Sequence, residues 1–180
     1  MSPNRAHPRR TRLLTLVLVA LIGGSAAAVA PAPTAPVAQA AESLTISQAE
    51  ARMVALLNQD RAGAGLTAYR VDPRLSAIAR ARSTNMATYN YLSHTQPDGR
   101  KFFDYLNAAK ITWYAAGEII AWNNWPDLSS SAAAANQGWL GSSSHRAVIM
   151  SRDDNYVGVG VARASNGRFY WTAVAIKGPD

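Results

Sequence analysis

Val157-Gly158-Val159-Gly160-Val161 is the stretch of this sequence that says most about its fold. The alternation of valine with glycine has the two-residue period of a β-strand and places every valine on one face. A second alternating stretch follows at residues 169–174. Asn166-Gly167 between the two is a strong hairpin signal, because both residues tolerate positive φ. The chain is therefore predicted to end in an antiparallel pair of strands.

Helical signals precede these strands. Ser47-x-x-Glu50 has the pattern of a capping box, and apolar residues at helical spacing follow it. Asp72-Pro73 is typical of a second helix start. The buried stripe of that second helix is predicted at Leu75, Ile78, Ala79, Met86 and Tyr89.

Shorter helices are predicted at residues 102–109 and 132–139, with a further helical turn at 143–150 capped by Ser142 or Ser143. Residues 117–121 form a short apolar segment between them. Because helices come first and strands last, we expect an α+β fold.

Residues 1–40 are typical of an export signal and its leader. Four arginines precede the apolar run 13–22, and Ala38-Gln39-Ala40 fits a small-x-small cleavage site. The alternative is a retained membrane anchor, since residues 13–30 approach the length of a spanning helix. We therefore expect a secreted protein with a linker at 41–46, one domain at 47–180 and no transmembrane segment in the mature chain.

The composition limits the possible partners. Four of the 18 basic residues and none of the 11 acidic residues precede Ala40, so the mature chain has 14 basic residues and a net charge of +3. No basic run remains, which argues against nucleic-acid binding. The chain has no cysteine, but about 140 residues suffice for a core without disulfides. We expect a monomer.

Only two histidines, His94 and His145, follow the leader. Histidine changes charge near neutral pH and commonly binds metals. Glu118 lies in the apolar segment, where a buried carboxylate needs a partner. Two histidines and a carboxylate could hold zinc or perform acid–base chemistry. The alternative is two unrelated surface histidines and a Glu118 that points to water.

An ordered set of short motifs resembles one known family. The motifs are Leu57-Asn58-x-x-Arg61, Asp72-Pro73-x-Leu75, Leu92-Ser93-His94, Pro97-Asp98-Gly99, Gly117-Glu118, Trp139-x-x-Ser142-x-x-His145-Arg146 and the Val-Gly repeat. Each motif is unspecific, but their order resembles the CAP superfamily of cysteine-rich secretory, antigen 5 and pathogenesis-related proteins, also called the SCP domain. The resemblance is to its bacterial branch.

This resemblance implies a single-domain α-β-α sandwich with a central, mostly antiparallel sheet. It also implies a cleft where two histidines and two acids meet. His94, Glu118 and His145 match three of those positions, while Ser142 replaces the second acid. Losing that carboxylate predicts weak, exchangeable binding of a divalent cation by His94, His145 and Glu118, with zinc preferred because it suits imidazole.

The resemblance favours a protein that binds an extracellular ligand in this cleft, such as a lipid, a cell-envelope component or a protein. The alternatives are a metal- or histidine-dependent hydrolase of peptides or envelope material, using His94, Glu118 and His145, and a cleft that only stabilises the fold. Ser142 could be a nucleophile for His145 or a helix cap. Arg146 could bind an anionic ligand or form a surface salt bridge.

The tryptophans fall into two groups. Trp139 and Trp171 lie in periodic segments and are predicted to be core residues. Trp122-Asn123-Asn124-Trp125 lies in a polar segment and could grip a sugar or a peptide. The alternative, which we favour for this loop, is that both of its tryptophans fold back onto the sheet.

Overall fold

A four-stranded sheet is the middle layer of the protein. The computed structural model describes residues 44–179, so the predicted leader and the first part of the predicted linker lie outside the described residues. β3 (Tyr156–Arg163) and β4 (Phe169–Lys177) form the predicted antiparallel ribbon. β1 (Arg70–Val71) adds to β3 in parallel, and β2 (Ala115–Asn123) adds to β4 in antiparallel, giving the order β1-β3-β4-β2.

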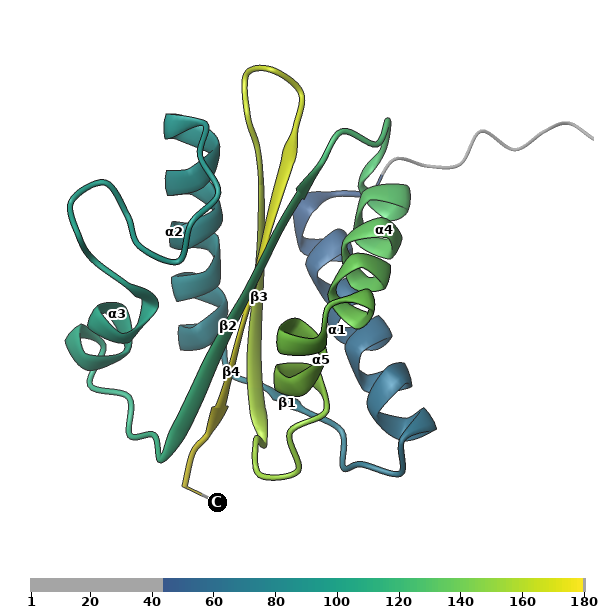
Figure 1. Ribbon diagram of the computed structural model, residues 1–180, viewed down its shortest axis with the longest axis vertical. Coiled ribbons are helices and arrows are strands. Elements are labelled where there is room, and N and C mark those ends of the chain that lie inside the picture. The colour runs from purple at the N-terminus through teal and green to yellow at the C-terminus, as the bar shows by residue number, and fades with distance from the viewer. Residues whose placement is uncertain (1–43, 180) are drawn as a thin grey trace, which may run out of the picture. The chain divides into compact units, whose positions relative to one another are not determined.

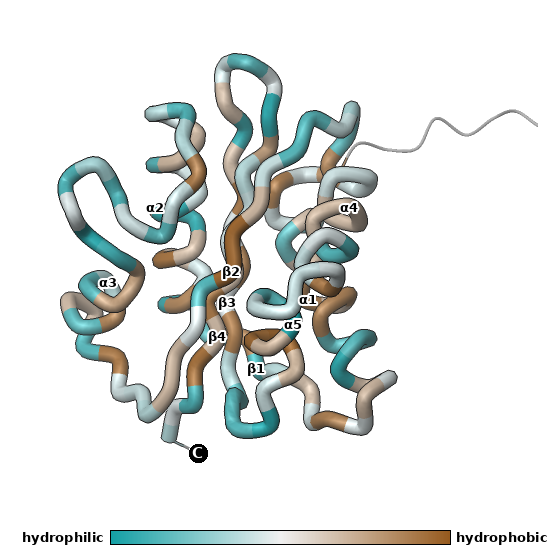
Figure 2. The backbone as a smooth tube through the Cα atoms, in the orientation of Figure 1, coloured by the Kyte–Doolittle hydropathy of each residue, from teal (hydrophilic) through white to brown (hydrophobic). Residues whose placement is uncertain are grey.

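Helices cover both faces of this sheet (Figure 1). One face carries α1 (Ile46–Gly63), α4 (Leu128–Gly141) and α5 (Ser143–Ile149). The other face carries α2 (Pro73–Tyr89) and α3 (Phe102–Ala108). Hydrophobic residues concentrate along the strands, and the turns are hydrophilic (Figure 2). The predicted α+β class and α-β-α sandwich are confirmed.

The Val-Gly repeat packs differently on the two faces of β3. Val157, Val159 and Val161 are buried in the core under α1 and α4. On the other face, a Cβ added to Gly158 would lie 2.1 Å from the Leu75 carbonyl carbon, and one added to Gly160 would lie 2.2 Å from the Arg80 nitrogen. The glycines therefore let the backbone of α2 lie directly on the sheet.

The start of α1 differs from the prediction. Thr45 is the N-cap, and its hydroxyl accepts a hydrogen bond from the Gln48 backbone while the Gln48 side chain accepts one from the Thr45 backbone. The predicted pair, Ser47 and Glu50, is wrong because Glu50 lies on the inward face of the helix. There it is buried, and its carboxylate accepts hydrogen bonds from Nε and Nη2 of Arg80.

The ends of α2 follow the sequence more closely. Asp72 is its N-cap and accepts a hydrogen bond from the Arg74 backbone, as predicted. Asn90 ends the helix in the left-handed conformation with φ 52°. Tyr89, predicted in the buried stripe, is 65% exposed, whereas Met86 and Ala87 of the same turn are buried, so Tyr89 lies on the outer side of the helix. α4 starts at Leu128, earlier than predicted, with Asp127 as its N-cap.

The tryptophans divide as predicted, with one correction. Trp139 and Trp171 are buried core residues. Trp122 and Trp125 do not fold back onto the sheet, since 42% of Trp122 and 52% of Trp125 is exposed. Trp122 is the penultimate residue of β2, and Trp125 lies in the loop before α4, so neither is covered by a helix.

The described core is self-contained. Its three clusters of buried apolar side chains draw only on residues after Leu44, and Ala40–Asp180 forms one compact unit by itself. Among residues 44–179, no helix is both long enough and apolar enough to cross a membrane.

Candidate functional site

Glu118 is held by a buried arginine. Glu118 lies in the middle of β2, an edge strand of the sheet, and α2 carries Arg82 to it. Nε of Arg82 donates to Oε2 of Glu118 at 2.7 Å, and Nη2 donates to Oε1 at 3.3 Å. Both side chains are fully buried. The carboxylate thus finds the partner that its burial requires.

His94 completes this arrangement from the loop after α2. Nη2 of Arg82 also donates to the Ser93 carbonyl oxygen at 2.8 Å, which fixes the backbone beside His94. Nδ1 of His94 then lies 2.8 Å from Oε1 of Glu118. The His94 side chain is 52% exposed. Because Nδ1 faces a carboxylate and donates to it, Nε2 is the nitrogen available to a ligand.

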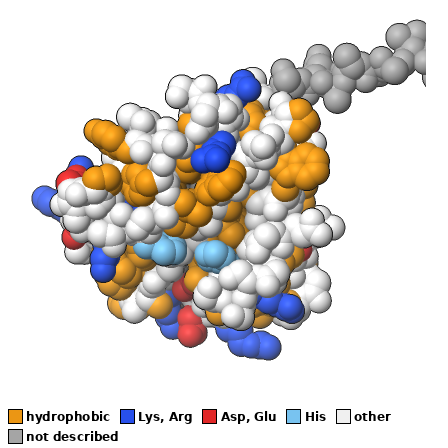
Figure 3. Space-filling model, turned by 45° about the horizontal axis from the view of Figure 1, so that its top comes forward, with side chains coloured by type: hydrophobic (Ala, Val, Ile, Leu, Met, Phe, Trp, Pro, Cys, Tyr) orange, Lys and Arg blue, Asp and Glu red, His pale blue; other side chains and the backbone are white. Residues whose placement is uncertain are grey.

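His145 approaches from α5. Val148 of α5 packs against Gly117 of β2, where an added Cβ would lie 3.0 Å from its methyl groups. His145 is half-buried. Burial lowers its pKa below 6.5, and the charge of nearby His94 lowers it further. Figure 3 shows the two described histidines as pale blue patches beside each other on one face. The structure thus places the two histidines beside each other on one face, with the buried Glu118 of β2 hydrogen-bonded to His94.

Ser142 and Arg146 contribute less. Ser142 occupies the N-cap position of α5, but its side chain makes no capping hydrogen bond; its hydroxyl lies 3.2 Å from that of Ser144. Arg146 is exposed, and it forms no ion pair with any residue of the described chain. Contact with an anionic ligand and a surface salt bridge both stay predictions for Arg146.

Arg82 is the residue that the sequence analysis missed. It lies in the apolar stripe of α2, three residues after Ala79 and four before Met86, and it is fully buried. An arginine at such a position signals a buried acidic or carbonyl partner elsewhere in the chain. One of its nitrogens, Nη1, has no hydrogen-bond partner. Desolvation raises the pKa of the adjacent Tyr91, and the positive charge of Arg82 opposes that shift.

The donor set for a metal is small. Among residues 44–179, no group of three or more His, Cys, Asp or Glu side chains is arranged to hold a metal ion. Both oxygens of Glu118 are occupied, Oε2 by Arg82 and Oε1 by His94. Glu118, predicted as the third ligand, is thus engaged elsewhere, and the imidazoles of His94 and His145 are the predicted ligands that remain for a cation.

Comparison with known proteins gives the family. The chain matches the CAP, cysteine-rich secretory protein family over residues 54–175. It is 30% identical over 128 residues to the uncharacterized protein YkwD of Bacillus subtilis, covering 71% of this chain and 47% of YkwD. It is 31% identical over 128 residues to the uncharacterized membrane protein YlbC of the same organism, covering 71% of this chain and 34% of YlbC.

Solved structures agree on the fold. An extracellular SCP-domain protein of Bacillus anthracis has 28% identity and a TM-score of 0.64, covering 74% of this chain and 44% of that one. An outer surface protein of Borrelia burgdorferi has 14% identity and a TM-score of 0.67, covering 76% and 98%. The chain belongs to the CAP family, as its motifs predicted. It spans less than half the length of the Bacillus relatives.

Proposed function

We propose that this CAP-domain protein works outside the cell by binding a ligand in the cleft between His94 and His145. The observation that supports this most directly is the buried chain of contacts from Arg82 through Glu118 to Nδ1 of His94. A fully buried ion pair is costly to form. Here it orients an exposed imidazole, which is an arrangement suited to a site held ready for a ligand.

The chemistry of the cleft suits a ligand that accepts or donates hydrogen bonds to imidazole. The lowered pKa of His145 keeps that ring neutral at pH 7. A lipid, a cell-envelope component and an extracellular protein are the ligand classes we propose. No hydroxyl of the described residues hydrogen-bonds to either imidazole as a nucleophile would, and Ser142 bonds to Ser144 instead. The arrangement therefore favours binding over a serine-type hydrolysis.

A zinc ion, when bound, would be held by His94 and His145 and would offer open coordination positions to a ligand. Glu118 would orient His94 through Nδ1, as carboxylates behind metal-binding histidines do. With only two protein ligands, we expect weak and exchangeable binding.

Zinc alone is the first probe. Thermal unfolding of residues 41–180 should shift to higher temperature with zinc chloride, and the shift should disappear in His94→Ala/His145→Ala. Asp98→Asn, which removes an exposed acid paired with Arg100 outside the cleft, should keep the shift. Absence of a shift in the unmodified protein, or its persistence in the double variant, would show that the cation part of the proposal is wrong.

Ligand binding is tested separately. Material retained by the exported protein after purification, analysed by mass spectrometry, should be present with the unmodified protein and depleted in His94→Ala/His145→Ala. Both proteins should also be assayed against peptide, ester and glycan substrates. Turnover that the double variant loses would replace the binding proposal with the hydrolase alternative.

A further inference from the structure

The end of the molecule at the β3–β4 turn exposes large apolar side chains. Trp122 lies at the end of β2, Trp125 in the loop before α4 and Ile46 at the start of α1, and all three are exposed. Asn123 anchors this loop, because its side-chain amide donates to the Ser131 carbonyl oxygen. We call the surface formed by Ile46, Trp122, Trp125, Arg163 and Arg168 the hairpin-end surface. Figure 3 shows hydrophobic and basic side chains gathered in the upper part of its view.

The same end is basic. The guanidinium of Arg168 lies 4.0 Å from the centroid of the Trp122 ring, and that of Arg163 lies 5.4 Å from the Phe169 ring. Residues 156–177, the whole hairpin, contain no Asp or Glu. The acid beside it, Asp127, accepts hydrogen bonds from the backbone and hydroxyl of Ser130 at the start of α4. That carboxylate is thus engaged with its own helix.

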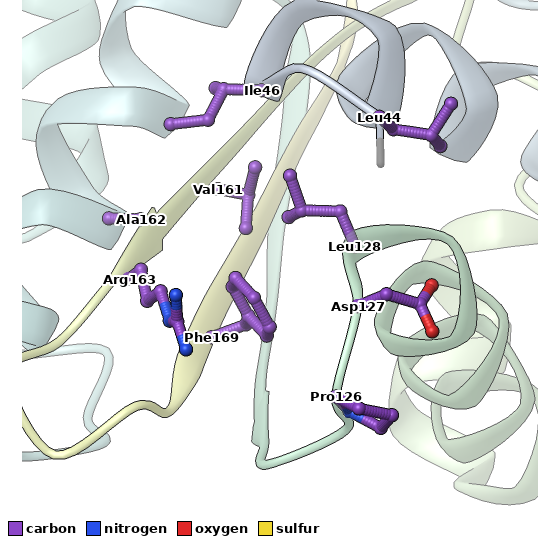
Figure 4. Close-up of a pocket in the computed structure, with 9 residues that line it drawn as sticks. All are labelled: Leu44, Ile46, Pro126, Asp127, Leu128, Val161, Ala162, Arg163 and Phe169. Atoms are coloured by element: carbon purple, nitrogen blue, oxygen red, sulfur yellow. The ribbon is translucent and has the colours of Figure 1, made fainter. Parts of the chain in front are cut away.

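An apolar pocket of about 260 Å³ opens beside these residues. It lies between the start of α1, the start of α4 and the hairpin, with Arg163 at its edge (Figure 4). Its wall is mainly Leu44, Ile46, Leu128, Val161 and Phe169. Because Leu44 is the first described residue, the chain that precedes it joins the domain at this same end.

We propose that the hairpin-end surface binds the interface of a lipid bilayer that contains anionic lipids. Tryptophan concentrates at bilayer interfaces because its ring is apolar and its N–H is polar. Arginine adds attraction to anionic headgroups.

A flat sugar is the other partner that exposed tryptophans commonly suit. Arg168 covers one face of the Trp122 ring at 4.0 Å, so a sugar could not stack there without displacing a cation–π contact. An arginine on an interfacial tryptophan, by contrast, remains free to reach a phosphate. The basic charge of the hairpin and the position of Arg168 over the Trp122 ring together favour an anionic bilayer over a sugar as the partner.

The test uses residues 41–180, which lack the apolar leader, and phosphatidylcholine vesicles with and without phosphatidylglycerol. We expect sedimentation with the anionic vesicles only, and a blue shift of tryptophan emission that Trp122→Ala/Trp125→Ala abolishes. That variant should lose roughly tenfold or more in partitioning. Arg163→Gln/Arg168→Gln should lose about 25-fold, at about fivefold for each arginine, and should depend less on salt.

The matched control is Tyr114→Ala/Arg152→Gln, which changes one exposed aromatic and one exposed arginine at the opposite ends of β2 and β3. It should bind vesicles as the unmodified protein does, because both changed residues lie away from the hairpin-end surface. Far-ultraviolet circular dichroism equal to that of the unmodified protein verifies the fold of each variant.

Three results would overturn the proposal. The first is no binding to anionic vesicles at low salt. The second is vesicle binding that the control variant and the hairpin-end variants share equally. The third is retention on insoluble peptidoglycan that requires Trp122 and Trp125 while vesicles are not bound, which would assign the surface to a glycan.

Discussion

Two buried arginines, one on each side of the sheet, show two uses of the same side chain. Arg61 of α1 and Arg82 of α2 are 1% and 0% exposed, and each lies in the apolar stripe of its helix. Arg61 donates to four backbone carbonyl oxygens, those of Thr67, Ile149, Ser151 and Asp154. Arg82 donates to one carboxylate and one carbonyl, and its Nη1 has no partner.

Arg61 holds loops together, whereas Arg82 positions the imidazole of His94 through Glu118. Arg61 ties the segments before β1 and β3 together and lies 3.8 Å from the centroid of the Tyr69 ring. Burial in that region raises the pKa of Tyr69 to about 12 and raises the pKa of Asp154. Arg82 instead holds Glu118, which holds His94. We infer that the Arg61 cluster serves stability and the Arg82 cluster serves the cleft.

Arg61→Met is the strongest test of this comparison. It leaves four carbonyl oxygens without their donor, so we expect a loss of about 4 kcal/mol or more in the free energy of unfolding, measured by urea denaturation. Arg52→Met, an exposed position on the same helix, should change it by less than about 0.5 kcal/mol. Equal effects of the two variants would contradict the role given to Arg61.

Arg82→Met should lower the free energy of unfolding by about 3 kcal/mol, because Glu118 becomes an unpaired buried charge. Arg82→Met/Glu118→Met should recover most of that loss in the same urea measurement, since it removes the charge as well. The double variant should show no zinc-induced thermal shift, because His94 no longer has the Glu118 carboxylate that orients it. Arg61 has no single partner whose replacement could rescue it. A double variant as unstable as Arg82→Met would contradict the proposed difference between Arg82 and Arg61.

The smallest expected effect concerns pH at the cleft. The folded pKa of His145 lies below 6.5, so the unfolded chain takes up the proton first as pH falls. The stability that neutral His145 provides is present above pH 6.5 and declines below it, until the folded pKa is passed. We expect His145→Gln to remove a decline of less than about 1 kcal/mol between pH 7 and pH 5, since the site is partly solvated.

Urea denaturation of both proteins at several pH values checks this prediction. All other titratable groups are present in both proteins, so the difference between their two curves of unfolding free energy against pH isolates the contribution of His145. A difference that stays constant with pH, or grows in favour of the unmodified protein on acidification, would show that His145 is not perturbed by burial and His94.

Much of the fold could be predicted because its signals are local. The alternation at residues 157–161, the Asn166-Gly167 hairpin signal and the Asp72 cap each depend on a few neighbouring residues, and the structure confirms the strand pair and the cap. In the hairpin turn Gly167 has positive φ, at 87°, but Asn166 does not. The α1 cap was misplaced because Thr45 and Ser47 both fit a capping pattern. Which one is used depends on which face of the helix the core requires, and that is a tertiary property.

The candidate site was predictable in part. His94, Glu118 and His145 were named from rare residue types and family motifs, while Arg82 was missed. Its partner lies 36 residues away on another element, and no local pattern connects the two. The exposure of Trp122 and Trp125 was also mispredicted, because apolar side chains favour burial on average and only the ends of the elements reveal which ones are left uncovered.

The missing side chains at Gly158 and Gly160 also matter for anyone who wishes to re-engineer this protein. Because main chain meets main chain there, α2 cannot slide along β3 to accommodate a new residue, and the placement of Arg82 two residues beyond Arg80 inherits that rigidity. On the other face, α1 and α4 supply buried side chains to the core, among them Met53, Leu57 and Trp139. Libraries aimed at thermostability belong at such side-chain contacts, away from α5 with His145 and from the stretch of α2 that carries Arg82.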